Sequence, residues 1–383
     1  PEMAGTEADV AYVAGQAYAI RALCYLNLAT WFSRAPYNSL TGASRWNEPC
    51  VPVYTTGTSI DTGGQPRESL RTVYGRIDQD IDRAIELLEK ARETTLAENN
   101  KSHINLYVAL GIKSRACLAE GDWDGAFKAA KRVIDEGGYA VGTKSDLTGG
   151  MNSLDKQNVM WGAGIQVADQ AGGYAGFFTH MDNKEGAYAK SAPKLISKQL
   201  YNRISATDIR RDWWDPSDKE SPYVSKKFSF ANVASFLGDY IYMRVEEMYF
   251  TAAEAALRLD DLKSARELMN TVMAERDPGY SANNRSGTLL GATTTTWTGS
   301  FLENILTHRR IELWGEYGRL FDVRRLGQGI DRRTDDGFSE ECISMMNRRN
   351  VNITKADTYD WVLTIPKAEL DANPNINEED QNP

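Results

Sequence analysis

The sequence predicts an all-α fold of stacked helical hairpins that carries long irregular insertions with minor β content. No proline occurs between Pro66 and Pro193 or between Pro222 and Pro278, and helical periodicity fills large parts of both intervals. Segments 104–136 and 244–276 resemble each other, each with the pattern of two helices joined by a short turn. Glycines and short apolar runs replace this periodicity between residues 139 and 240, which indicates an irregular excursion with a few short strands.

The first two helices are expected over residues 7–32 and 67–92. In each, apolar residues recur at helical spacing and are predicted to form a buried face. In the first helix this face is Val10, Val13, Ala14, Ala17, Ile20, Arg21, Cys24 and Leu28; in the second it is Leu70, Val73, Tyr74, Ile77, Ile81, Ile85 and Leu88. Three tryptophans are also predicted to be core residues, namely Trp31, Trp314 and Trp361.

The two similar segments superpose after a shift of 139 positions, and small or aliphatic residues then coincide. The pairs are Ser114 with Ala253, Cys117 with Ala256, Ala126 with Ala265, and Val133 with Val272. Small residues at these positions let two antiparallel helices approach closely, as in the tetratricopeptide unit. We therefore expect an α–α superhelix of such hairpins.

A single domain is predicted over residues 1–383. Its helical scaffold is expected at 7–138, 241–277 and 299–326, and irregular ligand-binding insertions at 36–66, 139–240 and 278–298. Residues 360–383 are expected to form a polar C-terminal tail.

Charge and composition exclude several classes of protein. The net charge of −9 argues against nucleic-acid binding, because phosphates require a basic surface. No apolar run approaches the ~18 residues of a membrane-spanning helix. Four cysteines are too few for a disulfide framework. Cys24 and Cys117 are predicted to be buried thiols, whereas Cys50 and Cys342 lie in loop-like sequence and are free to pair or not.

The stretch 309–327 places charges where a helix, expected over 301–317, should be apolar. Such charges are costly unless they are paired, so the sequence predicts an ionic network. Its members are Arg309, Glu312, Glu316, Arg319, Asp322 and Arg325. The cluster is either an active site with paired carboxylates or an internal strut. Arg309 and Arg319 beside the two glutamates would keep both carboxylates ionised, which favours the strut.

Several motifs in order along the chain resemble those of the SusD/RagB family of nutrient-capturing surface lipoproteins. They lie in residues 21–37, 73–80, 242–255, 268–276, 309–327 and 365–383. Tyr317 stands where the family usually has Gly, and His308 where Glu is common. The resemblance implies a non-catalytic binding protein on the outward face of the outer membrane, with a SusC-like TonB-dependent transporter as partner. It also implies a lipidated cysteine in an N-terminal segment that this sequence lacks, and hence a trimmed chain.

Aromatic residues outside the helical core faces are the candidate ligand contacts. A surface indole offers a flat apolar face with a polar edge, which suits the C–H face of a sugar ring. The predicted ligand-binding residues are Trp46, Asn47, Trp161, Tyr174, Arg210, Trp213, Trp214, Asp215 and Trp297. The alternative is that each aromatic side chain caps the core beneath its own loop, as is expected for Trp123 in its hairpin turn.

Metal and cofactor sites find little support in the sequence. The three histidines are scattered, and no paired-cysteine or His-Glu-x-x-His spacing occurs. Asp212, Asp215 and Asp218 alternate around two tryptophans but lack the central glycine of a calcium loop. No cofactor is therefore expected.

Three functional hypotheses remain open from the sequence. The first is capture of glycan oligosaccharides, and the second is capture of oligopeptides by a less aromatic site. The third, from another class, is a helical glycoside hydrolase.

Overall fold

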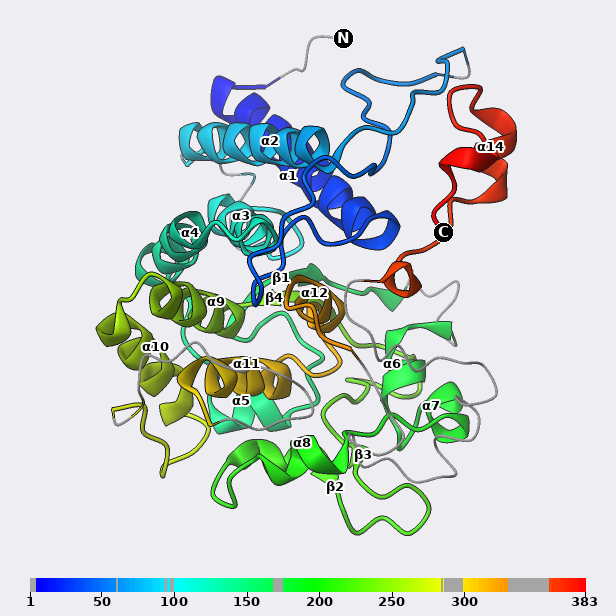
Figure 1. Ribbon diagram of the computed structural model, residues 1–383. Coiled ribbons are helices and arrows are strands. Elements are labelled where there is room, and N and C mark those ends of the chain that lie inside the picture. The colour runs from blue at the N-terminus through cyan, green and yellow to red at the C-terminus, as the bar shows by residue number, and fades with distance from the viewer. Residues whose placement is uncertain are drawn as a thin grey trace.

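The computed structural model describes residues 5–59, 61–92, 94, 96, 100–167, 175–283, 285, 299–329 and 358–383. Helices dominate this part of the chain, which confirms the predicted all-α class (Figure 1). The scaffold helices are α1 (Glu7–Phe32), α2 (Leu70–Lys90), α3 (Leu106–Glu120), α4 (Trp123–Glu136), α9 (Val245–Arg258), α10 (Leu262–Ala274), α11 (Phe301–Glu312) and α12 (Arg319–Arg325).

The scaffold helices stack in successive layers (Figure 1). The α1–α2 pair lies at one end, α3 and α4 follow, and α9, α10 and α11 continue the stack. The neighbours α2 and α3, α4 and α9, and α9 and α11 are in contact, so each layer packs on the next as in a helical-repeat protein.

The two predicted hairpins turn in the same way. Gly121 and Asp260 both have positive φ, 77° and 62°, and each is followed by an aspartate that caps the next helix. Asp122 accepts a hydrogen bond from the Gly125 amide, and Asp261 accepts one from the Ser264 amide, both at 3.0 Å. These positions are related by the same shift of 139, and the paired small residues are all buried. The internal repeat therefore extends to the details of the turn.

The buried face of α1 is not the one predicted. Val13 and Ile20 are 46% and 49% exposed, and Cys24, Leu28 and Trp31 are exposed as well. The face that packs on α2 is made of small residues and tyrosines: Ala11, Tyr12, Gly15, Ala19, Ala22, Tyr25, Leu26 and Ala29. At Gly15 a Cβ atom would lie 2.8 Å from Leu88 Cγ, so close approach of the two helices selects the small face over the face with larger side chains.

The excursion between α4 and α9 combines short helices with two small sheets. Strand β1 (Val159–Ala163) pairs antiparallel with β4 (Tyr240–Arg244), and β2 (Trp214–Asp215) pairs antiparallel with β3 (Val224–Ser225). The remaining elements are α5 (Lys144–Thr148), α6 (Phe177–Met181), α7 (Ala187–Ser191), α8 (Lys198–Asn202) and the 3-10 helix η4 (Ile209–Trp213). Most of them gather on one flank of the helical stack (Figure 1).

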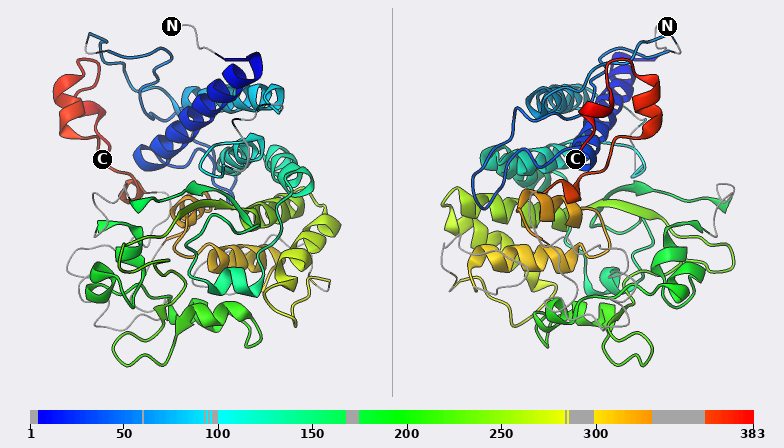
Figure 2. Two further views of the ribbon diagram at one scale, coloured as in Figure 1. Left: turned by 180° about the vertical axis from the view of Figure 1, so that it is seen from behind. Right: turned by 45° about the vertical axis from the view of Figure 1, so that its right-hand side comes forward.

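The C-terminal tail folds back beside α1 (Figure 2). It contains η5 (Tyr359–Trp361), α14 (Lys367–Ala372) and η6 (Glu378–Asp380), so it is more structured than a polar tail suggests. The Asn382 side chain donates hydrogen bonds to the carbonyls of Phe32 and Leu363, both at 2.9 Å, and accepts one from Arg67. The tail thereby closes over the end of the first helix.

None of the described helices combines the length and apolar character needed to cross a membrane. The predicted helix over 301–317 ends earlier, at Glu312, and residues 313–318 form a turn with positive φ at Gly315 and Gly318.

Candidate functional site

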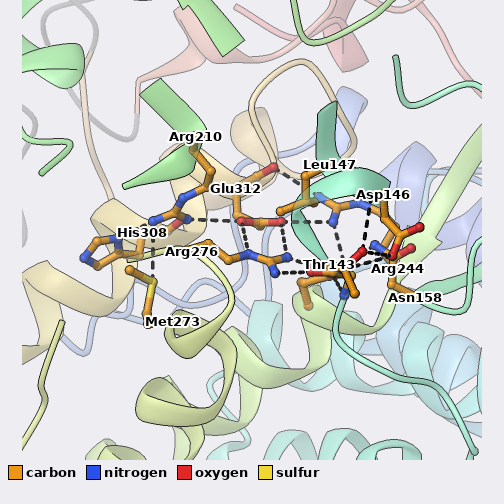
Figure 3. Close-up of polar contacts among 12 residues, drawn as sticks. Thr143, Asp146, Leu147, Asn158, Arg210, Arg244, Met273, Arg276, His308 and Glu312 are labelled. Carbon is orange, nitrogen blue, oxygen red and sulfur yellow. Dashed lines mark hydrogen bonds and ion pairs between the residues drawn. The ribbon is translucent and has the colours of Figure 1, made fainter. Parts of the chain in front are cut away.

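Glu312 stands at the centre of a buried ionic network (Figure 3). Three arginines from different elements surround its carboxylate. Arg210 from η4 lies at 3.1 Å, Arg244 from the end of β4 at 3.0 Å, and Arg276, just after α10, at 2.9 Å. All four side chains are fully buried, so the excursion and the scaffold are tied together inside the core.

Further carboxylates balance these arginines. Asp208 pairs with Arg210 at 2.7 Å, and Glu246 pairs with Arg276 at 2.7 Å and with Arg244 at 3.0 Å. Burial alone would raise the pKa of Glu312, but the surrounding guanidinium groups overcome it and hold the pKa well below its usual value. The carboxylate is thus permanently ionised near neutral pH.

A second part of the network follows the remaining charges of the 309–327 stretch. Arg309 pairs with Asp322 at 2.9 Å rather than with Glu312, and Arg325 bridges Asp322 and Glu254 at 2.8 and 2.7 Å. Arg319 is half-buried and donates a hydrogen bond to Gln328 at 3.3 Å. The carboxylates of Glu312 and Glu316 are held by residues outside the stretch, including Lys227, which the sequence did not single out.

Three predicted ligand contacts are core residues in the structure, and the prediction that they bind ligand is corrected. Arg210 is fully buried and committed to Asp208, Glu312 and His308. Trp213 and Trp214 are each 1% exposed. Their rings therefore offer no surface for stacking.

The other predicted contacts are dispersed. Trp46 is half-buried and packs edge-on against Tyr74 at 5.6 Å between ring centroids, while Asn47 beside it is exposed. Asp215 lies at the rim of a polar pocket next to η4. Tyr174 and Trp297 fall outside the described residues. Among the predicted contacts that the structure describes, only Trp161 lines an aromatic pocket.

This aromatic pocket has a volume of about 430 Å³ and lies where β1, β4 and α6 meet α1, α3 and the turn after α11. Its defining side chains are Trp161, Phe177, Phe228, Tyr240, Tyr242 and Tyr317. The Trp161 and Tyr242 rings meet edge-to-face at 5.0 Å, and Tyr242 is 41% exposed. The size falls within the range of small-molecule sites, and the lining is the one expected for flat, partly apolar ligands.

The polar groups of the aromatic pocket are fixed in place. Arg115 stacks 4.0 Å above the Tyr317 ring and makes a bidentate pair with Glu247 at 2.8 and 2.7 Å. Asn27 accepts a hydrogen bond from the Tyr317 hydroxyl at 3.3 Å. Because each charge in the wall has a partner, the pocket presents a rigid surface without uncompensated charge.

The tyrosines of β4 were missed by the sequence-based prediction. Tyr240 and Tyr242 alternate at strand spacing, which was the available signal, but they adjoin a scaffold motif and lie far in sequence from Trp161. Only the pairing of β1 with β4 brings them together.

A larger hollow, of about 850 Å³, lies between α1, residues 50–67 and the C-terminal tail. Its walls are largely apolar and include Leu28, Val51 and Ile365. The Arg67 guanidinium at its edge is already bound to backbone carbonyls and to Asn382. No tryptophan is among the described residues that line this hollow, so it offers no indole face.

Among the described residues, no group of three or more His, Cys, Asp or Glu side chains is placed to hold a metal ion. Asp218, one of the three aspartates considered for calcium, instead accepts hydrogen bonds from the amides of Glu220 and Ser221.

Comparison with solved structures shows the same architecture. A SusD-like carbohydrate binding protein from Bacteroides vulgatus aligns over 98% of this chain and 79% of its own, with 27% identity and a TM-score of 0.77. A SusD superfamily protein from Bacteroides thetaiotaomicron aligns over 100% and 80%, with 23% identity and a TM-score of 0.76. Surface glycan-binding protein A from Bacteroides uniformis shares the fold at 18% identity and a TM-score of 0.64, over 100% of this chain and 80% of its own.

No curated protein matches the chain. The SusD family, however, matches residues 182–383, which include the ionic network around Glu312, β4, α9 to α12 and the C-terminal tail. With the fold, the network and this match in agreement, the chain belongs to the SusD family.

Proposed function

We propose that this protein is a non-catalytic cell-surface binding protein that captures glycan oligosaccharides. The observation that carries this proposal is the aromatic pocket around Trp161 and Tyr242. Aromatic faces stack on the C–H faces of sugar rings, and a wall without uncompensated charge suits a neutral glycan. The description of the similar Bacteroides vulgatus protein as carbohydrate-binding supports the same ligand class.

Delivery to a SusC-like TonB-dependent transporter, and a lipid anchor on the outward face of the outer membrane, are the remaining parts of the proposal. Both rest on membership of the SusD family. Co-purification of a tagged copy with the transporter encoded beside its gene tests the partner. Recovery of the tagged protein without any outer-membrane transporter would speak against delivery.

The non-catalytic assignment is supported by the state of the buried carboxyl groups. Glu316, which lines the aromatic pocket, has its pKa lowered because Arg244 and Lys227 outweigh the effect of burial. Glu120 is different: burial, then Asp78 and Asp122, raise its pKa to about 9. Glu120, however, lines neither the aromatic nor the polar pocket. Among the described residues that line the aromatic pocket, no carboxyl group with a raised pKa is thus placed to donate a proton.

Isothermal titration against a panel of neutral oligosaccharides and a mixture of oligopeptides tests the ligand class. We expect saturable binding of at least one oligosaccharide and none of the peptides. Saturation by peptides with no response to any glycan would replace the proposal by peptide capture. Release of reducing sugar that is lost in a folded Glu316→Gln or Glu120→Gln variant would instead identify a glycoside hydrolase.

A further inference from the structure

A second pocket, of about 390 Å³, lies between α5, α8 and the η4–β2 segment. Its walls are polar and share no residue with the aromatic pocket. The side chains that matter are Lys144, Tyr201, Arg211, Asp212, Asp215 and Lys226. The pocket therefore differs in chemistry from the aromatic pocket.

Arg211 is held in position without an anionic partner. Its guanidinium lies 4.3 Å above the Tyr201 ring and donates a hydrogen bond of 2.7 Å to the Ile204 carbonyl. Within the described part of the chain, no carboxylate pairs with it. An oriented guanidinium with remaining N–H donors is suited to a planar, two-oxygen anion such as a carboxylate.

Two further charges in the wall are also unpaired. The ammonium of Lys144 and the carboxylate of Asp212 have no side-chain partner among the residues that the structure describes. Asp215, in contrast, lies 3.8 Å from Lys226 and accepts hydrogen bonds from Ser217. The charges left for a ligand are thus Arg211 and Lys144 against Asp212.

This balance limits the ligand. Two cations against one carboxylate leave a single net positive charge, which is balanced by a monoanion and exceeded by a dianion such as a phosphate ester. The Asp212 carboxylate has the capacity to accept hydrogen bonds from the hydroxyl groups of a ligand, and such charge-assisted bonds are stronger than neutral ones. The complementary ligand is therefore a singly charged, hydroxyl-rich molecule.

We propose that this pocket binds an acidic sugar unit, a uronic acid, whose carboxylate lies on Arg211 and Lys144 while its hydroxyls donate to Asp212. The sugar part of this inference rests on the proposed function, whereas the carboxylate part rests on the charges of this pocket alone. The protein would then hold one glycan class at the aromatic pocket and recognise an acidic unit at a separate site.

Titration with glucuronate and with galacturonate, at about 50 mM and then 500 mM NaCl, tests the proposal, because binding to unpaired charges is screened by salt. We expect one of the two uronates to bind and to weaken at least threefold at the higher salt. Lys144→Gln should weaken it about fivefold, and Arg211→Gln about tenfold or more. Lys144→Gln is the deciding variant, because Lys144 is exposed and has no partner to lose, whereas Arg211 also packs on Tyr201.

Lys198→Gln is the matched control: Lys198 is also exposed and also opens a short helix, α8, but lies outside the pocket lining. It should leave uronate binding unchanged. Absence of binding, or binding that Lys144→Gln leaves unaltered, would overturn the proposal. Equal competition by acetate would show that a free carboxylate suffices, and Lys144-dependent binding of a tripeptide would assign the pocket to peptides; either result rejects a sugar ligand.

The outcome is separable from that of the proposed function. Tyr242→Ala should reduce binding of neutral oligosaccharides and leave uronate binding intact. If neutral oligosaccharides do not bind at all while Lys144-dependent uronate binding persists, the assignment of the aromatic pocket as a glycan site is rejected. The assignment of the polar pocket as a uronate site is then retained.

Discussion

The ammonium nitrogen of Lys227 lies 2.5 Å from Oε1 of Glu316, and this buried pair joins the irregular excursion to the turn after α11. Lys227 is 1% exposed and also donates hydrogen bonds to the carbonyls of Glu312 and Trp314, at 2.7 and 2.8 Å. The Glu312 carbonyl belongs to the end of α11, where backbone acceptors lack intrahelical partners, and the Trp314 carbonyl lies in the turn that follows. Burial lowers the pKa of Lys227 to about 8, although Glu316 acts against this shift. The neighbours Phe228 and Glu316 line the aromatic pocket, so this contact supports the proposed site.

Lys227→Met removes the charge but keeps the length of the side chain. It removes one donor from Glu316 and one from the Glu312 carbonyl, which both keep Arg244, and it removes the Lys227 hydrogen bond to the Trp314 carbonyl. Losing hydrogen bonds to a buried charged group in this way costs about 1.5 to 3 kcal/mol. We expect the free energy of unfolding, measured by urea denaturation, to fall by that amount. We also expect weaker oligosaccharide binding, because the pocket wall loses its anchor.

Lys226→Met is the control for this experiment. The Lys226 side chain is 53% exposed and its ammonium lies 3.8 Å from Asp215, so its loss should cost less than about 0.5 kcal/mol. If the two variants lost equal stability, the anchoring role of Lys227 would be wrong.

The helices and turns were predictable because their signals are local. The turns at Gly121 and Asp260 follow from residue types within a few positions, and the helices follow from periodicity and the absence of proline. The buried face of α1 could not be predicted in the same way, because both faces of this helix carry apolar residues. The close approach of α1 to α2 at Gly15 determines which face is buried. This approach involves Leu88 of α2, which is far from Gly15 in the sequence.

The ionic network shows why the candidate site was harder to predict. Its charge pattern indicated buried pairing, but Arg210 and Glu312 are 102 positions apart, and no local rule identifies such partners. Tryptophans in loop-like sequence were taken as surface residues. In the structure the excursion forms small cores of its own, in which Trp213 and Trp214 are buried. The tyrosines of β4 supply the exposed aromatic surface instead.

Tyr242→Ala tests the aromatic pocket directly. Tyr242 is 41% exposed and meets Trp161 edge-on, so its removal should disturb the fold less than loss of a buried ring. Loss of one stacking ring, at about 0.5 to 1.5 kcal/mol, predicts oligosaccharide affinity lower by about twofold to thirteenfold in calorimetric titration. Trp31→Ala removes an exposed aromatic residue of α1 that lies outside the pocket and should leave affinity unchanged. A loss caused by Trp31→Ala alone would move the site to the α1 surface.

Acid should destabilise the protein through Glu254. Burial acts to raise its pKa, but Arg325 and Arg258 overcome this effect and lower the pKa from 4.5 to about 2. A carboxyl whose pKa is lower in the folded state stabilises the fold above its unfolded pKa. That contribution, about 3 kcal/mol at roughly 1.4 kcal/mol per pKa unit, is lost as the pH falls from about 4.5 toward 2. Urea denaturation between pH 6 and pH 3 should show this fall, and Glu254→Gln should be less stable at pH 6 with a shallower dependence on pH.

Glu86 provides the comparison, because its pKa is also lowered to about 2, through Lys90 and Arg83, but its side chain is exposed rather than buried. Added salt screens exposed charges far more than buried ones. At about 0.5 M NaCl the difference between wild type and Glu86→Gln should vanish, whereas that for Glu254→Gln should persist. Equal sensitivity of the two variants to salt would contradict burial of the Glu254 pair.

Two helical glycines should respond in opposite directions to the same substitution. A Cβ at Gly15 in α1 would lie 2.8 Å from Leu88 Cγ and 3.3 Å from the Ala84 carbonyl oxygen, so Gly15→Ala forces α1 and α2 apart. Such overpacking costs about 1 to 3 kcal/mol. At Gly75 in α2 no atom lies within 4 Å of the added Cβ, so Gly75→Ala should gain up to about 1 kcal/mol from helix propensity. Thermal or urea unfolding of the two variants measures both effects, and a stabilising Gly15→Ala would show that the buried face of α1 has been assigned wrongly.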